Sequence, residues 1–239
     1  MMMVPDRLGD AARNAGMDPF RYSSMFIANK FHDEGSERRI FNPMWLGMSP
    51  ATVWNLTAYD DRAGITHTRY LVPRECDVRV DRHVLVVCVR GVCKRDDGAP
   101  AEGAIGVYFG PNSPHNFAAH VPASLPQTRK FAQIFAVRMA LQRVRNRWSD
   151  DYNISTVHVV TDSEYVVKAL SEDIDEWRTN GFQDARGGKI ANHSEIEILD
   201  DLMLDLADDG IRVSFWSVDK AENKKADRLA KGVLGLPPH

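Results

Sequence analysis

The sequence predicts an α/β fold with a mixed five-stranded sheet, in which a three-strand antiparallel meander joins two parallel strands and helices flank the sheet. First, residues 84–89 form a continuous apolar, β-branched run, which is typical of a strand buried on both faces. Second, two more apolar segments follow after short turns, which predicts a meander. Third, helical periodicities then alternate with short apolar segments, which favours crossover connections.

Five segments have the composition of strands, namely residues 84–89, 104–109, 116–121, 156–161 and 211–218. Turn residues separate the first three, with Asp97-Gly98 in one connection and Gly110-Pro111 in the other. Short turns between consecutive strands predict antiparallel neighbours. The last two strands each follow a helical segment, so they are expected to be parallel to the first strand.

The longest helix is predicted from apolar residues at spacings of 3, 4, 3 and 4, which are Ile134, Val137, Leu141, Val144 and Trp148. A second helix is expected from residue 162 to about residue 170, because Asp162-Ser163 is a helix-start signal. Further helices are predicted over residues 196–206 and 226–230. The resulting order is β-β-β-α-β-α-α-β-α.

Residues 1–80 are harder to interpret and are predicted to be an N-terminal extension of unknown role, partly irregular, while residues 81–239 form the α/β domain. Trp45 and Trp54 lie among prolines in the extension, which suggests an arm that packs on something. No apolar run approaches the roughly 20 residues that cross a bilayer, so a membrane role is not expected. The protein is expected to be intracellular.

Charge is unevenly distributed, although the net charge is only −3. Residues 127–148 contain six basic residues and no acid, whereas residues 191–210 contain seven acids and neither Lys nor Arg. A basic run of this kind is either an ordinary solvated helix face or a surface that follows phosphates. The acidic segment should face away from any phosphate backbone.

Several motifs, in the correct order over about residues 84–232, resemble the ribonuclease H type 1 family of the ribonuclease H-like superfamily. The most specific are Thr161-Asp162-Ser163-Glu164-Tyr165-Val166 and Asn223-Lys224-Lys225-Ala226-Asp227-Arg228-Leu229-Ala230. The remaining matches are the first strand with Val86–Gly91, the glycine-bearing Gly106–Pro111, the helix start Thr128–Ala136, and Trp177, Asn180, Gly181 and Asn192. The resemblance implies a ribonuclease H-like sheet.

The resemblance also implies four acids around two divalent ions that hydrolyse the RNA strand of an RNA/DNA hybrid. Arg90 and Gln133 stand at two of these acid positions, and only Asp162 and Asp227 remain as catalytic remnants and metal ligands. The loop over residues 218–223 also lacks the histidine usual in the family. A two-metal site should therefore not assemble, so no cofactor is expected, with Mg²⁺ or Mn²⁺ relevant only if activity survives.

Each remaining acid has a structural interpretation beside the functional one. Asp162 is a remnant ligand or the N-terminal cap of the following helix, and capping is favoured. Asp227 is a remnant ligand or the partner of Arg90, and the ion pair is favoured because an unpaired buried Arg is costly.

The resemblance suggests where nucleic acid would bind. The predicted contact residues are Thr128, Arg129, Arg178, Asn180, Arg186, Lys189 and Asn192. The expected partner is an RNA/DNA hybrid or double-stranded RNA, with a protein partner through residues 1–80 as a further option.

Three functions remain open. The first is a catalytically impaired ribonuclease H-like module that binds a duplex. The second is an active metal-dependent hybrid endoribonuclease with an altered site that uses Asp162 and Asp227. The third is a protein-interaction scaffold on the same fold.

Overall fold

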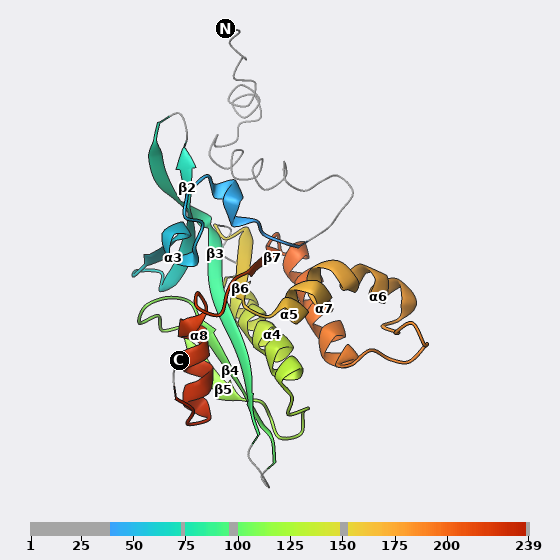
Figure 1. Ribbon diagram of the computed structural model, residues 1–239. Helices are drawn as coiled ribbons and strands as arrows, with labels where there is room; N and C mark the ends of the chain where they lie inside the picture. The colour runs from blue at the N-terminus through green and yellow to red at the C-terminus, as the bar shows by residue number, and fades with distance from the viewer. Residues whose placement is uncertain (1–38, 73–74, 96–99, 149–152, 238–239) are drawn as a thin grey trace. The chain divides into compact units, whose positions relative to one another are not determined.

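The computed structural model describes residues 39–237 except 73–74, 96–99 and 149–152 (Figure 1). The described residues all belong to one compact unit by their contacts. The expected extension over residues 1–80 therefore lies partly outside the described residues.

The sheet contains seven strands: β1 (Thr57–Asp60), β2 (Ile65–Val72), β3 (Asp77–Lys94), β4 (Glu102–Tyr108), β5 (Phe117–His120), β6 (Thr156–Thr161) and β7 (Arg212–Ser217). Strands β3, β4 and β5 form the predicted antiparallel meander. Strand β6 pairs parallel to β3, and β7 pairs parallel to β6, as predicted. The hairpin β1–β2 adds two strands that the sequence did not reveal, and β2 pairs antiparallel with β3.

The helical segments are η1 (Pro43–Leu46), α3 (Val53–Leu56), α4 (Arg129–Trp148), α5 (Glu164–Lys168), η2 (Ala169–Asp173), α6 (Ile174–Asn180), α7 (His193–Asp208) and α8 (Lys224–Val233). The helix of the second crossover was expected to end near residue 170, but helical structure continues through the π-helical η2 to Asn180. Ile174 is buried in the core and holds this otherwise polar segment against it. The helix ends where Gly181 adopts a left-handed conformation.

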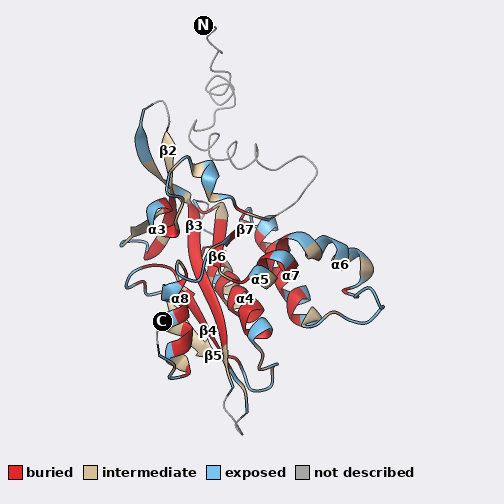
Figure 2. Cartoon of the chain, viewed as in Figure 1, coloured by how far each residue is buried: buried red, intermediate tan, exposed pale blue. Residues whose placement is uncertain are grey.

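Strand β3 lies at the centre of the sheet, and its alternate residues serve two separate cores. Leu85 and Val87 belong to the larger cluster, which includes the apolar faces of α4 and α7. Val86 and Cys88 belong to a second cluster on the opposite face, together with Phe41. Figure 2 shows the central strands buried along most of their length between these layers. A strand covered on both faces explains the unbroken apolar run of the sequence.

Residues 39–56 help to cover the second face of the sheet. Phe41, Val53 and Leu56 are buried in the second cluster. The backbone of Phe41 also donates to the Phe215 carbonyl at 2.9 Å, and the Phe215 N–H donates to the Arg39 carbonyl at 2.6 Å, so this segment covers the outer edge of β7. The arm is therefore packed on the sheet, and β3 begins at Asp77, before the predicted domain start.

Two glycines bring helices onto β3 and β4 from opposite sides. A Cβ on Gly91 would lie 2.2 Å from the backbone of Gln133 on α4. A Cβ on Gly106 would lie 2.3 Å from the Ala226 carbonyl on α8. Any larger residue would push the helix away. Since Gly106 pairs with Arg90 in the antiparallel register, α8 lies directly over the Arg90 side of β3.

No helix in the described part of the chain has both the length and the apolar character needed to cross a membrane.

Candidate functional site

Three elements bring the predicted site residues together. Arg90 projects from β3 toward α8, Asp162 directly follows the end of β6, and Asp227 lies in the first turns of α8. Parallel pairing of β3 with β6 places Asp162 near Arg90, and the close approach of α8 at Gly106 supplies Asp227. All three side chains are almost fully buried, at 5 to 6% exposure.

Arg90 forms ion pairs with both remaining acids. Its Nη1 pairs with Asp162 Oδ2, and its Nε lies 3.1 Å from Asp227 Oδ1. Asn223, the residue before α8, donates from Nδ2 to Asp162 Oδ1 at 2.8 Å and to the Val89 carbonyl at 2.9 Å. The predicted Arg90–Asp227 ion pair is confirmed, and Arg90 also contacts the second acid.

Sequence reasoning missed one member of this cluster, Lys231. Its Nζ lies 2.8 Å from Asp227 Oδ2, and its side chain is 9% exposed. The signal was available, because residues four apart on a helix share a face and Lys231 follows Asp227 by four positions. With Lys231 included, two cations balance two carboxylates, and the formal charge of the cluster is zero.

Burial and charge act against each other on these groups. Burial lowers the pKa of Arg90, and the negative charge of Asp227 opposes that change. Burial by itself would raise the pKa of Asp227, but the hydrogen bond from Lys231 and the charges of Arg90 and Lys220 outweigh it and leave this pKa below its ordinary value. Both groups therefore remain charged at neutral pH.

The predicted capping role of Asp162 is wrong. Ser163 is the N-cap of α5, and its side chain accepts a hydrogen bond from the Val166 N–H at 3.3 Å. The Asp162 carboxylate is instead directed to Arg90 and Asn223. Ser is as good a cap as Asp, so Asp162 is left to pair with the buried guanidinium.

Gln133, at the other position where the resemblance implies an acid, lies in the second turn of α4 and is buried. Its backbone contacts β3 at Gly91, the residue after Arg90. Gln133 thus lies on the face of β3 that packs against α4, whereas Arg90 projects from the opposite face toward α8.

The resemblance stated from the sequence implies a two-metal centre, and the residues present do not fit one. Hard divalent cations need several anionic oxygens. Here Asp162 and Asp227 already face Arg90 and Lys231, and the described residues contain no group of three or more His, Cys, Asp or Glu side chains that could hold an ion.

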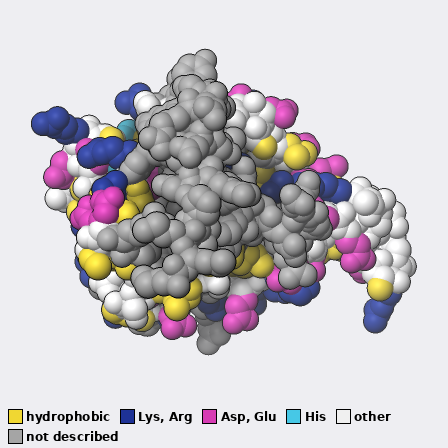
Figure 3. Space-filling view, turned by 90° about the horizontal axis from the view of Figure 1, so that it is seen from above, with side chains coloured by type: hydrophobic (Ala, Val, Ile, Leu, Met, Phe, Trp, Pro, Cys, Tyr) yellow, Lys and Arg dark blue, Asp and Glu magenta, His cyan; other side chains and the backbone are white. Residues whose placement is uncertain are grey.

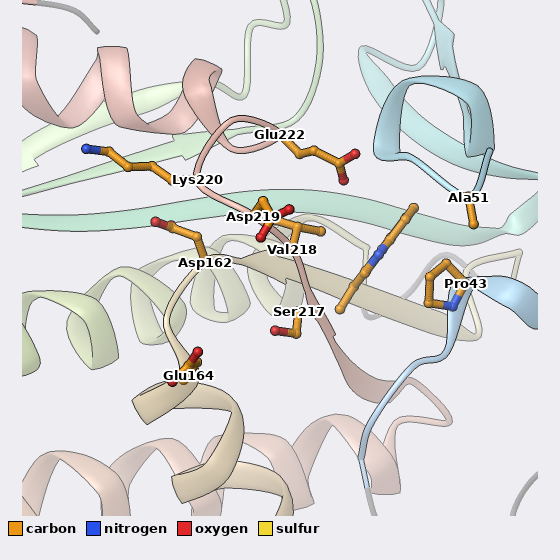
Figure 4. Close-up of a pocket in the computed structure, with 10 residues that line it drawn as sticks. Pro43, Ala51, Asp162, Glu164, Ser217, Val218, Asp219, Lys220 and Glu222 are labelled. Atoms are coloured by element: carbon orange, nitrogen blue, oxygen red, sulfur yellow. The ribbon is translucent and has the colours of Figure 1, made fainter.

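A pocket of about 440 Å³ opens beside Asp162 (Figure 4). Pro43 and Ala51 of the arm line one end, and Asp162 and Lys220 lie toward the other. Its remaining lining residues are Glu164, Trp216, Ser217, Val218, Asp219 and Glu222. Acids outnumber bases around this pocket, so it is a poor place for a phosphate.

The basic run on α4 is partly neutralised by the acidic helix α7. Arg138 Nε lies 2.9 Å from Glu195 Oε1, and Arg145 Nη1 lies 2.7 Å from Asp205 Oδ2. Arg143 lies over the ring of Phe117. The six bases therefore do not form one continuous phosphate track.

The start of α4 remains available to a ligand. Arg129 is exposed, and Thr128 accepts a hydrogen bond from the Phe131 N–H at 3.2 Å. Lys130 is exposed as well, with its ammonium over the ring of Tyr165. No acid occupies the first turn of this helix. The charges of Arg129 and Lys130 and the partial charge of the helix N-terminus are therefore all positive, which favours an anion here.

The other predicted contacts lie around α6 and the loop that follows it. Arg178 forms a bidentate ion pair with buried Asp200, with both N–O distances at 2.6 Å. Asn180 bonds to the backbone of Gln183 through both ends of its amide. These contacts shape the loop and use the donors that a phosphate would need.

Lys189 donates to the Gly181 carbonyl at 2.7 Å, and Arg186 is exposed. Asn192 adopts a left-handed conformation before α7, and its Nδ2 lies 3.4 Å from the Tyr165 hydroxyl. On the end of the molecule seen in Figure 3, basic and acidic side chains are interspersed where they are not covered by grey atoms. Tyr165 contacts both Asn192 and Lys130, so Asn192 lies near the start of α4, whereas Asn180 and Lys189 belong to the loop after α6.

A meander joined to two parallel strands, with two acids brought together beside the central strand, defines a ribonuclease H-like domain. The sequence profile of the RNase H family matches residues 83–234, which is more than half of the chain. The chain belongs to the RNase H family.

Individual relatives agree with this assignment. Ribonuclease H1 of Mus musculus is 27% identical over 151 residues, covering 62% of this chain and 49% of the relative. Ribonuclease H of Schizosaccharomyces pombe is 30% identical over 146 residues, covering 61% of this chain and 51% of the relative. The match thus spans about half the length of these curated relatives.

Solved structures with a similar fold include a foamy viral protease-reverse transcriptase in complex with double-stranded DNA. It is 25% identical, with a TM-score of 0.48, and the match covers 62% of this chain and 92% of that chain. LC11-RNase H1 in complex with an RNA/DNA hybrid is 16% identical, with a TM-score of 0.46, over 63% of this chain and 96% of that chain.

Proposed function

We propose that this chain binds a nucleic-acid duplex, an RNA/DNA hybrid first among them, and cleaves it poorly or not at all. The observation that carries the proposal is the pairing of Arg90 with both Asp162 and Asp227. Membership in the RNase H family supports the choice of ligand. The altered cluster supports the loss of chemistry.

The chemical argument concerns charge. Two-metal hydrolysis holds two cations about 4 Å apart, and only a strongly anionic set of ligands overcomes their mutual repulsion. The cluster here has a formal charge of zero and already contains two cationic side chains. A divalent ion would have to displace both buried cations, which costs far more than ordinary ligand exchange.

Binding does not depend on that chemistry. Lys and Arg bind phosphates through counterion release, without reading sequence. Arg129 at the exposed start of α4 is the first candidate, with Thr128 beside it. Arg186 and Lys189 in the loop after α6 are the second.

The proposal is tested by anisotropy and gel assays with the full chain and a labelled RNA/DNA hybrid. Affinity that falls with salt, and no cleavage with Mg²⁺ or Mn²⁺, is the expected result. Metal-dependent cleavage that Asp162→Asn abolishes would establish the active-enzyme alternative instead. No affinity for any duplex at low salt would favour the protein-interaction scaffold.

A further inference from the structure

Building on the proposed function, we infer that Arg90 and Lys231 are internal counter-ions that replace the divalent cations of this family. They neutralise Asp162 and Asp227 permanently, so a phosphate backbone approaches this part of the molecule without any metal ion. This cluster therefore differs from a two-metal centre in what neutralises its carboxylates: two side chains take the place of the metal ions. Duplex binding by this chain should not require a divalent cation.

The contacts of the two carboxylates support a complete replacement. Asp162 Oδ1 accepts from Asn223 and its Oδ2 pairs with Arg90. Asp227 Oδ1 lies 3.1 Å from Arg90 Nε and its Oδ2 lies 2.8 Å from Lys231 Nζ. Each of the four oxygens lies within hydrogen-bond or ion-pair distance of a polar group of the chain. The contact between Arg90 Nε and Asp227 Oδ1 is an ion pair without hydrogen-bond geometry.

The two cations come from different elements, and their contacts are not redundant. Arg90 lies on β3 and contacts one oxygen of each acid, whereas Lys231 lies on α8 and contacts only Asp227. With Arg90 alone, the buried cluster would have a net charge of −1. Lys231 removes that excess, which would otherwise repel a phosphate at close range.

Exposed cations lie within electrostatic reach of this neutral cluster. The charge of Arg129 lowers the pKa of Arg90, and the charge of Lys220 lowers the pKa of Asp227, so both side chains act on the cluster. Both are exposed. Arg129 and Lys220 therefore add exposed positive charge near the cluster, and the neutralised Asp162 and Asp227 no longer oppose a phosphate. The acids that are still unneutralised, Glu164, Asp219 and Glu222, lie around the pocket beside Asp162.

The direct test compares affinity of the full chain for a labelled RNA/DNA hybrid in EDTA and in Mg²⁺ at equal ionic strength. The expected dissociation constants differ by less than about twofold, because no metal takes part in neutralisation. Binding that needs Mg²⁺ would overturn this inference and leave the proposed function intact. Absence of binding in both buffers would overturn both.

Lys231→Gln tests the second counter-ion. Affinity in EDTA should fall about tenfold, because one buried negative charge would then be unbalanced, and Mg²⁺ should restore part of the lost affinity. Lys224→Gln is the matched control, since Lys224 is exposed on the same helix and the charge change is identical. If Lys224 contacts a phosphate directly, its loss should weaken binding equally in EDTA and in Mg²⁺.

The ratio of the affinity in EDTA to the affinity in Mg²⁺ separates a counter-ion role of Lys231 from a purely structural role. Lys231→Arg should preserve the wild-type ratio, because the charge is kept. An unchanged ratio in Lys231→Gln would remove Lys231 from the mechanism. If that variant does not fold, the melting temperature of the wild-type chain decides: no shift with Mn²⁺ is expected, and a saturable rise would show an ion bound in the cluster.

Discussion

Lys231 Nζ lies 2.8 Å from Asp227 Oδ2, one helical turn further along α8, while Asp227 Oδ1 faces Arg90 of β3. The Arg90–Asp227 ion pair joins the last helix to the central strand through charge as well as packing. Buried ion pairs are costly to disrupt when a single partner is removed. The same residues therefore affect stability and ligand binding, and the variants below are chosen to separate the two effects.

Arg90→Met should destabilise the fold by about 3 kcal/mol, because Asp162 and Asp227 would remain buried with fewer partners. Urea unfolding of wild type and variant measures the loss. Adding Asp162→Asn to Arg90→Met should recover part of it, since one of the unpaired charges is then removed. A wild-type urea midpoint for Arg90→Met would show that the cluster contributes little.

Restoring both acids by Arg90→Asp with Gln133→Glu should give little or no Mn²⁺-dependent cleavage of a labelled hybrid, because Lys231 still occupies Asp227. Adding Lys231→Ala should increase cleavage, since an Asp227 oxygen becomes available to an ion. Asp162→Asn in that triple background is the negative control. Equal cleavage with and without Lys231→Ala would contradict the assigned role of Lys231.

Arg129→Ala should weaken hybrid binding and reduce the slope of log affinity against log salt by about one, as expected for one lost phosphate contact. Arg147→Ala is the matched control, because Arg147 is also exposed on α4 but lies near its far end. Equal losses in the two variants would mean that α4 binds through general charge and not through its first turn.

Arg178→Ala should lower stability by roughly 2 kcal/mol, because its bidentate partner Asp200 is buried. Its effect on hybrid affinity should be smaller than that of Arg129→Ala, since two of its donors already bond Asp200. Chemical denaturation and anisotropy on the same samples measure both. A large affinity loss with unchanged stability would restore Arg178 as a phosphate contact.

His158 should make the fold sensitive to acid. Burial lowers its pKa from the ordinary 6.5 to about 3, so the folded chain holds the neutral ring. Below pH 6.5 the unfolded chain takes up a proton on His158 that the folded chain does not bind, so the free energy of unfolding falls as the pH falls. The loss should be about 2 kcal/mol between pH 7 and pH 4.5. His158→Gln, compared with wild type in urea unfolding at both pH values, should show a shallower loss. Parallel pH profiles would contradict this assignment.

Much of the fold was predictable from local patterns. The apolar run at residues 84–89 indicated a strand buried on both faces, and the spacing from Ile134 to Trp148 indicated α4. The hairpin β1–β2 was not predicted, because Trp and Pro in the same region suggested irregular structure. The helical continuation through Ile174 was missed because a polar stretch can be helical when a single buried residue anchors it.

The sequence by itself predicted, through its resemblance to the family, that Arg90 and Gln133 stand at two acid positions and that Asp162 and Asp227 occupy the other two. Only the tertiary structure decided how those charges are compensated: Lys231 completes the cluster, Ser163 takes the capping role, and α7 neutralises part of the basic helix. The reason is that composition fixes the number of charges, whereas their pairing depends on distances of a few ångströms between elements far apart in the chain. Those distances are set by close packing of the helices on the sheet, which no local pattern contains.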